Sequence, residues 1–312
     1  MAYRIYDFVL ESNVSLVELP SESATSPSLH FCLTSIDASS LPNPFWIREF
    51  RLDTGHVAVR LGVRGHNYCL RFPDLADFEL DSVSARITCF RYPNVAESSI
   101  RHLLLDQVIP RLASHWGRPV VHGSCVEYDG SALVFVGPSG AGKSTLATFL
   151  HKAGLDLLSD DGVLLDTRGT GVTAIPGYQG ARLWEDAYEG LELKQEAVAM
   201  AHYSSKKRVS FQKRKWPLKL PLQAVFVLDP GQTGVGSAPS IQRITGTDAA
   251  MALLRNAFYL DPNNGGSLAR VFDSLASVAA DASVAVFRLS VLRGFEHLPK
   301  MYQAILEHVE AR

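Results

Sequence analysis

Apolar and polar positions alternate along residues 57–64 of this chain, where valine or leucine occupies every odd position. Such a period of two predicts a β-strand with one face in a core and the other toward water. Comparable strand-like stretches, separated by Ser, Pro, Asn and Gly turns, occupy residues 29–36, 45–52, 56–63, 66–72 and 83–92. Residues 1–96 are therefore predicted to form a smaller, β-rich N-terminal domain.

The pattern becomes helical from residue 95 to residue 115. The apolar positions that recur there at helical spacing are Ile100, Leu103, Leu104, Val108 and Leu112. Pro110 lacks a backbone N–H, so we expect it to kink or break this helix. We expect residues 97–116 to bridge the first domain to a second one that spans residues 117–312.

The second part mixes strands and helices. Strand patterns lie at residues 119–127, 131–136, 156–159, 163–165, 222–228 and 283–289, and helical patterns at 248–259, 267–280 and 299–309. Asp129-Gly130 between two strand patterns predicts a two-residue hairpin, which places His122 opposite Gly137. A hairpin at this point and helices between strands together predict an α/β fold with a mixed sheet.

Residues 137–144 form a complete G-x-x-x-x-G-K-[ST] phosphate-binding loop between a predicted strand and a predicted helix. Backbone N–H groups of such a loop converge on phosphate, so the predicted nucleotide-binding residues are Gly137, Pro138, Ser139, Gly140, Ala141, Gly142, Lys143, Ser144 and Thr145. Lys143 is expected at the β- and γ-phosphates, and Ser144 at Mg²⁺. A glycine-rich turn that only joins two elements is disfavoured, because both motif and flanks fit.

Two adjacent carboxylates, Asp160 and Asp161, follow the next predicted strand. Adjacent side chains at a strand end point in opposite directions, so we expect one to face an acceptor hydroxyl and the other Mg²⁺ or His122. The alternative is a pair that merely caps a turn before Gly162. His122, likewise, is either a group that orients a carboxylate or an ordinary hydrogen-bonded strand histidine.

The run His122-Gly-Ser-Cys, the loop GPSGAGKST at 137–145 and the run LSDD at 158–161 resemble the HPr kinase/phosphorylase family. The runs are most similar to the HPr-kinase-like enzymes that are encoded in lasso-peptide gene clusters. Residues 176–184, PGYQGARLW, also resemble a segment of those enzymes. The resemblance implies a mixed-sheet P-loop kinase core that uses ATP and Mg²⁺ to phosphorylate a serine hydroxyl. It implies catalytic roles for Lys143, His122, Asp160 and Asp161, with Asp161 favoured as base, and Mg²⁺ ligation by Ser144 and Asp160.

One position departs from the classical HPr kinases, because Gly180 stands where they have an acidic residue two positions before an arginine. A second metal ligand and a phosphorylase back-reaction are therefore open, although Glu185 or Asp186 could substitute. The arginine here is Arg182, which is either a phosphate or substrate contact or a salt-bridged structural residue.

Residues 206–219 hold seven basic residues and no acidic one. They are either a solvated loop or a contact for an anionic peptide, and Lys213, Arg214 and Lys215 are the candidate substrate residues. The net charge of −2 argues against a general nucleic-acid binder. The four cysteines show no C-x-x-C spacing, so neither zinc nor a disulfide framework is expected.

The sequence lacks an apolar run of the roughly 18 residues that a membrane helix needs, and residues 1–7 do not read as a signal peptide. We therefore expect a cytoplasmic ATP-dependent serine kinase that acts on a peptide, most simply a lasso-type precursor. A kinase of a small hydroxylated metabolite and a nucleotide-binding regulator without transfer activity are the alternatives. The chain could also assemble as a homo-oligomer.

Overall fold

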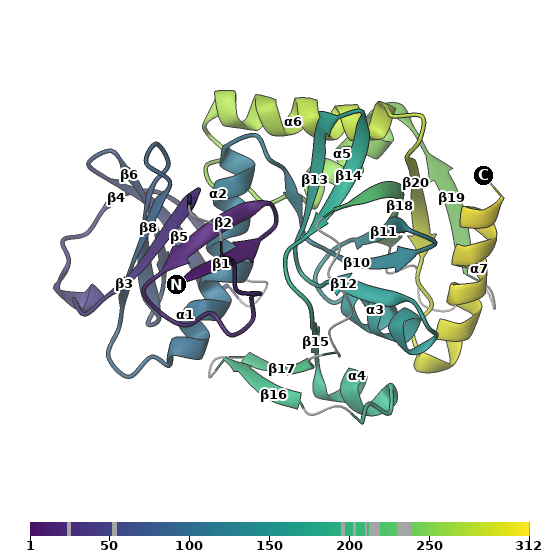
Figure 1. Ribbon diagram of the computed structural model, residues 1–312, viewed down its shortest axis with the longest axis horizontal. Helices are drawn as coiled ribbons and strands as arrows, with labels where there is room; N and C mark the ends of the chain where they lie inside the picture. The colour runs from purple at the N-terminus through teal and green to yellow at the C-terminus, as the bar shows by residue number, and fades with distance from the viewer. Residues whose placement is uncertain are drawn as a thin grey trace.

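The computed structural model describes residues 1–23, 26–51, 55–194, 197–201, 204–209, 211, 219–229 and 239–311. It is a mixed α/β structure with two large sheets, each of mixed strand direction, and a third small sheet. Figure 1 shows the first sheet on the left, the second on the right and the small one below them. Among the described residues, no helix combines the length and apolar character needed to cross a bilayer.

The first sheet is built from eight strands. In spatial order they are β1 (Ala2–Ile5), β2 (Phe8–Ser12), β3 (Leu29–Thr34), β8 (Arg86–Arg91), β7 (Ala76–Asp81), β6 (Asn67–Phe72), β5 (Val57–Arg64) and β4 (Phe45–Arg51), with the 3₁₀ turn η1 (Ala38–Ser40) between β3 and β4. β2, β3 and β8 run parallel, and the remaining pairs are antiparallel. The sequence pattern missed β1, β2 and β7.

A helical segment crosses from the first sheet to the second as α1 (Glu97–Leu103), η2 (Leu104–Val108) and α2 (Ile109–His115). Of the predicted kink or break at Pro110, the break does not occur, because the segment stays helical through to His115. The middle segment is a π-helix, in which the N–H of Ile109 bonds to the carbonyl of Leu104. An α-helical turn would push the proline ring against the carbonyl of Asp106, and the wider π turn relieves that clash without ending the helix.

The second sheet has the predicted mixture of strand directions. Its strands follow the order β12 (Asp156–Ser159), β10 (Gly123–Tyr128), β11 (Ser131–Val136), β18 (Leu220–Asp229), β14 (Gly171–Pro176), β13 (Val163–Gly169) and β9 (Val120–Val121), while β20 (Ala285–Ser290) pairs with β18 and β19 (Ser240–Ile244). β11, β18 and β20 are parallel, and β10 is antiparallel to β11.

The hairpin that precedes the phosphate loop has the predicted register. Tyr128 pairs with Ser131 and Gly123 pairs with Val136, which leaves His122 level with Gly137 at the open end. Asp129 and Gly130 both have positive φ, 47° and 72°, as a type I′ turn requires. The turn therefore fixes where His122 stands relative to the loop.

Helices cover both faces of the second sheet at its central strand β11. Leu133 and Phe135 pack with α3 (Lys143–Lys152) and α7 (Leu298–Glu310), whereas Val134 and Val136 pack with α5 (Gly246–Arg255) and α6 (Gly265–Ala280). This alternation follows from the period of two along a strand. Since both faces are covered, the strand is apolar throughout, as its sequence indicated.

The third sheet was not anticipated from the sequence. It consists of β15 (Ala181–Leu183), β17 (Ser204–Val209) and β16 (Ala197–Ala201), with the helix α4 (Glu185–Gly190) after β15. A 3₁₀ turn, η3 (Phe295–His297), leads into α7. Strand β15 contributes to the site because it carries Arg182.

Candidate functional site

The glycine-rich loop connects β11 directly to α3, as the motif requires. A Cβ on Gly137 would lie 2.8 Å from the carbonyl oxygen of Leu228, so a larger residue would push β11 and β18 apart. Gly142 has φ 91°, a conformation that L side chains rarely adopt, and α3 begins at the next residue. The two glycines thus set the loop tightly between the central strands and the N-terminus of the helix.

Lys143 is buried and folds back over its own loop. Its Nζ donates hydrogen bonds to the carbonyl oxygens of Gly137 at 2.8 Å and Pro138 at 2.9 Å. Burial lowers the pKa of this ammonium, although the charges of Asp161 and Asp160 oppose that shift. The cation is therefore held at the loop by two neutral carbonyl groups.

Asp160 is only 2% exposed and lies behind the loop. Its Oδ1 accepts hydrogen bonds from the hydroxyls of Ser124 at 2.6 Å and Ser144 at 3.0 Å, and its Oδ2 accepts one from the backbone N–H of Arg182 at 2.9 Å. Burial, and then the neighbouring Asp161, raise its pKa. Ser124 was missed from the sequence, although it lies two residues after His122 along the predicted strand.

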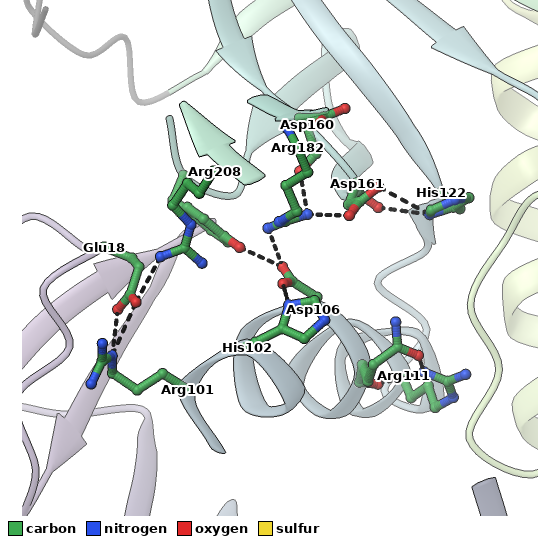
Figure 2. Close-up of polar contacts among 12 residues, drawn as sticks. Glu18, Arg101, His102, Asp106, Arg111, His122, Asp160, Asp161, Arg182 and Arg208 are labelled. Atoms are coloured by element: carbon green, nitrogen blue, oxygen red, sulfur yellow. Dashed lines mark hydrogen bonds and ion pairs between the residues drawn. The ribbon is translucent and has the colours of Figure 1, made fainter. Parts of the chain in front are cut away.

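Asp161 points away from Asp160, as expected for adjacent residues at a strand end (Figure 2). Its carboxylate forms an ion pair with Arg182, and its Oδ1 lies 3.9 Å from Nδ1 of His122. Burial acts to raise the pKa of Asp161, but the positive charges of Arg182, first, and of Lys206 act against it, and the pKa lies well below the usual range. Asp161 is therefore held in its ionised form.

His122 stands at the open end of the hairpin, half-buried against Phe258 at a ring separation of 5.8 Å. Its Nδ1 lies 3.1 Å from the backbone carbonyl oxygen of Asp161. A carbonyl only accepts hydrogen bonds, so Nδ1 carries the proton and Nε2 of the neutral ring is an acceptor. Burial lowers the pKa of His122 despite the charge of Asp161, which favours this neutral form.

Arg182 connects the catalytic candidates to the bridging helix. It is 2% exposed, and besides Asp161 its guanidinium binds Oδ1 of Asp106 at 2.6 Å. The hydroxyl of Tyr178 donates to the same oxygen at 2.6 Å, and His102 pairs with the other oxygen of Asp106. We refer to Asp106, Arg182 and Asp161 as the buried relay.

The relay has a further connection to the segment between β2 and β3, which carries Glu18. Arg208 lies over the ring of Tyr178, and its Nη1 is 2.7 Å from Oε1 of Glu18, which also pairs with Arg101 at 3.0 Å (Figure 2). One signal in the sequence pointed to Asp106, because it is a carboxylate four residues after His102 within a mostly apolar predicted helix. Nothing in the sequence linked it to Arg182, 76 positions later.

The phosphate loop and the residues beside it open onto one cavity of about 420 Å³. Residues 139–146 of the loop and α3 form one wall, and His122, Asp161 and Arg182 line it near the loop. The lining also includes Trp184, Phe295 and Met301, so the cavity combines charged with apolar side chains. Lys206 also lines this cavity and lies 5.3 Å from the ring of Trp184.

The predicted substrate residues have mixed outcomes. Lys213, Arg214 and Lys215 lie outside the described residues. Two other members of the basic tract form ion pairs, Lys207 with Glu185 and Arg208 with Glu18. For Arg182, the ion pairs with two carboxylates favour the structural alternative.

The backbone conformation at position 180 explains why glycine stands there in place of an acidic residue. Gly180 has φ 125°, and an added Cβ would lie 3.2 Å from the carbonyl oxygen of Val209. Of the two candidate substitutes, Asp186 lines the cavity and Glu185 pairs with Lys207. The described residues contain no group of three or more His, Cys, Asp or Glu that could hold a metal ion.

Comparisons with known proteins find little. No family model matches the chain, and no curated protein matches it. Among solved structures, the chain is similar to the HPr(Ser) kinase/phosphatase from Coxiella burnetii, with a TM-score of 0.33 and 9% identity over 62% of this chain and 97% of that chain. At that TM-score the similarity carries no argument about function.

Proposed function

We propose that this protein is an ATP- and Mg²⁺-dependent kinase that transfers the γ-phosphoryl group to a serine hydroxyl of a peptide. The observation that carries the proposal is the convergence of four groups on one cavity. Lys143 and Ser144 come from the phosphate loop, and Asp161 and His122 from strand ends beside it. A phosphoryl transferase needs a phosphate cradle and a group that handles the hydroxyl proton, and both are present.

The residues fit ATP and Mg²⁺. Open space surrounds the Cα atoms of Gly140 and Gly142, where an added Cβ would meet nothing within 4 Å, so a phosphate can approach the backbone closely. The hydroxyl of Ser144 and the carboxylate of Asp160 touch each other, and both are the oxygen ligands that Mg²⁺ prefers. These two residues would hold the ion, which would supply charge neutralisation at the β- and γ-phosphates.

The two aspartates then have separate tasks. Asp160 is fixed by three hydrogen bonds and stays beside Ser144. Asp161, kept ionised by Arg182, accepts the hydrogen bond of the acceptor hydroxyl and serves as its base. His122 presents an unprotonated Nε2 beside it and orients the hydroxyl or shares its proton.

Support for a peptide acceptor comes from the sequence. The runs at 137–145 and 158–161 resemble kinases of lasso-peptide gene clusters, which favours the serine of a ribosomally made precursor. The basic tract at 206–219 would attract acidic groups of such a peptide. A small hydroxylated metabolite is the second acceptor class. ADP release that is stimulated by free alcohols would distinguish it from a peptide acceptor.

The proposal is tested by incubating the full chain with ATP, Mg²⁺ and serine-containing precursor peptides, then measuring ADP release and the phosphopeptide by mass spectrometry. We expect one phosphate on serine and loss of both signals in Lys143→Ala. Nucleotide binding without phosphoryl transfer to any peptide or small alcohol would instead identify a regulator.

A further inference from the structure

A second cavity adjoins the phosphate loop. It measures about 360 Å³ and touches the loop at residues 137–139, whereas the first cavity follows the loop from Ser139 onward. His122 and Ser139 line both cavities. A group in the second cavity would therefore meet the loop next to His122, beside any nucleotide held along α3.

The charged side chains described in the lining of this second cavity are all basic. Arg111 from α2 and Arg255 from the end of α5 line it together with Phe50, Phe258 and Tyr259. No aspartate or glutamate is among the described residues of its lining. Two cations in a partly apolar pocket without a counter-charge attract an anion.

Arg111 shows this imbalance most clearly. Its guanidinium lies 5.4 Å from the ring of Phe258, and Nη1 donates only to Gln107, to the backbone oxygen at 2.7 Å and to Oε1 at 2.8 Å. It forms no ion pair with a described residue, and removal from water lowers its pKa to about 10. Figure 2 shows it on the same helical segment as Asp106, below His122 in the view.

Arg118 provides the contrast within the same chain. It also lies over a phenylalanine, Phe8, at 5.6 Å, but its guanidinium pairs with Asp7 at 2.7 Å. The two arginines thus share their stacking and differ in their counter-charge. The stacking alone does not explain why Arg111 is left without a carboxylate.

We propose that the second cavity is the acceptor subsite, and that Arg111 and Arg255 bind a carboxylate or phosphate group that the acceptor carries close to its hydroxyl. This inference rests on the proposed function, which it deepens by assigning the acceptor an anionic group. A small hydroxy acid and a serine peptide with a neighbouring acidic residue both supply this chemistry. Arg111 and Arg255 are specificity residues here, and the reacting atoms stay with Asp161 and His122.

The test compares matched acceptors by isothermal titration calorimetry on the full chain. One arm uses glycerate against its amide, and the other uses an end-blocked serine pentapeptide with aspartate or asparagine after the serine. Each is measured with and without a non-hydrolysable ATP analogue and Mg²⁺. In at least one arm the acidic member should bind at least about tenfold more tightly, since hydrogen bonds to charged groups have that strength.

Variants of the arginines show which residue causes the preference for the acidic acceptor. Arg111→Gln should remove it without changing affinity for the ATP analogue, Arg111→Lys should retain part of it, and Arg118→Gln should leave it intact. If thermal melting shows that Arg111→Gln does not fold, the exposed Arg255→Gln must lower the preference instead. The arm that responds identifies the source of the anion.

Two results would overturn the inference. The first is equal affinity for the acidic and the amide acceptors in both arms. The second is a preference for the acidic acceptor that survives Arg111→Gln. Where that variant does not fold, survival of the preference in Arg255→Gln has the same consequence. Failure of the ATP analogue to bind would contradict the proposed function alone, because the acidic preference is also measured without nucleotide.

Discussion

The phosphate loop and the buried relay support the same cavity but are built in opposite ways. The loop is contiguous, and Lys143 is held by carbonyl groups five and six residues away. The relay joins Asp106, Arg182 and Asp161 from a helix, a small sheet and a strand end. The loop therefore depends on local backbone geometry, whereas the relay depends on three elements packing correctly at once.

The difference also concerns charge. Lys143 faces neutral carbonyl oxygens, so its charge is left to act on a ligand. Arg182 is buried between two carboxylates, which neutralise its charge within the protein. The guanidinium thereby fixes the position of Asp161 and keeps it ionised. We infer that changes in the loop affect chemistry first and changes in the relay affect stability as well.

The largest effect is expected at the end of the relay. Asp161→Asn should slow phosphoryl transfer by about 10²–10⁴-fold, because the hydroxyl loses its proton acceptor while ground-state contacts remain. Titration should show nearly unchanged ATP–Mg²⁺ affinity. Asp160→Asn is the comparison, and it should weaken both binding and rate because it disturbs Ser144. A variant Asp161→Asn with full activity would assign the base elsewhere.

The loop should give the next largest effect. Lys143→Ala should lower the turnover number by about 10²–10³-fold, since a positive charge is lost where negative charge develops. Its melting temperature should stay close to that of the wild type, because only two hydrogen bonds to loop carbonyls disappear. A large loss of stability in this variant would remove the contrast between loop and relay.

Asp106→Asn addresses the relay without touching the cavity. Breaking a buried ion pair by removing one partner costs about 3–5 kcal/mol of unfolding free energy, which urea denaturation measures. The matched control is Glu185→Gln, which removes a solvent-exposed pair with Lys207 and should cost far less unfolding free energy, because water screens exposed charges. Equal stability of the two variants would mean that the relay contributes no more than a surface pair.

The smallest effect concerns the pH dependence of His122. Burial lowers its folded pKa, so below about pH 6.5 the unfolded chain binds more protons and stability falls as the pH falls. His122→Asn should reduce this slope, measured by urea unfolding at pH 7.5 and 5.5. Part of the slope should remain, because burial also lowers the pKa of His115. An unchanged slope would mean that His122 does not titrate abnormally.

The sequence predicted the elements around the loop well. Strands 131–136 and 156–159 were predicted with the bounds that the structure has, and so was the hairpin register that brings His122 to Gly137. Short turns and apolar runs carry such information locally. Strands β1, β2, β7, β14 to β17 and β19 were missed, because their pairing and burial depend on distant neighbours rather than on their own pattern.

By itself, the sequence determined the phosphate loop, the helix behind it and the adjacent pair of carboxylates, since glycine geometry and strand periodicity act over a few residues. Only the tertiary structure decided that Ser124 joins Ser144 at Asp160, that Asp106 holds Arg182 against Asp161, and that Arg111 faces a cavity without an acidic partner. The hydrogen bonds and ion pairs among them join residues between 16 and 76 positions apart. Long-range packing brings them together, and burial then sets their charges.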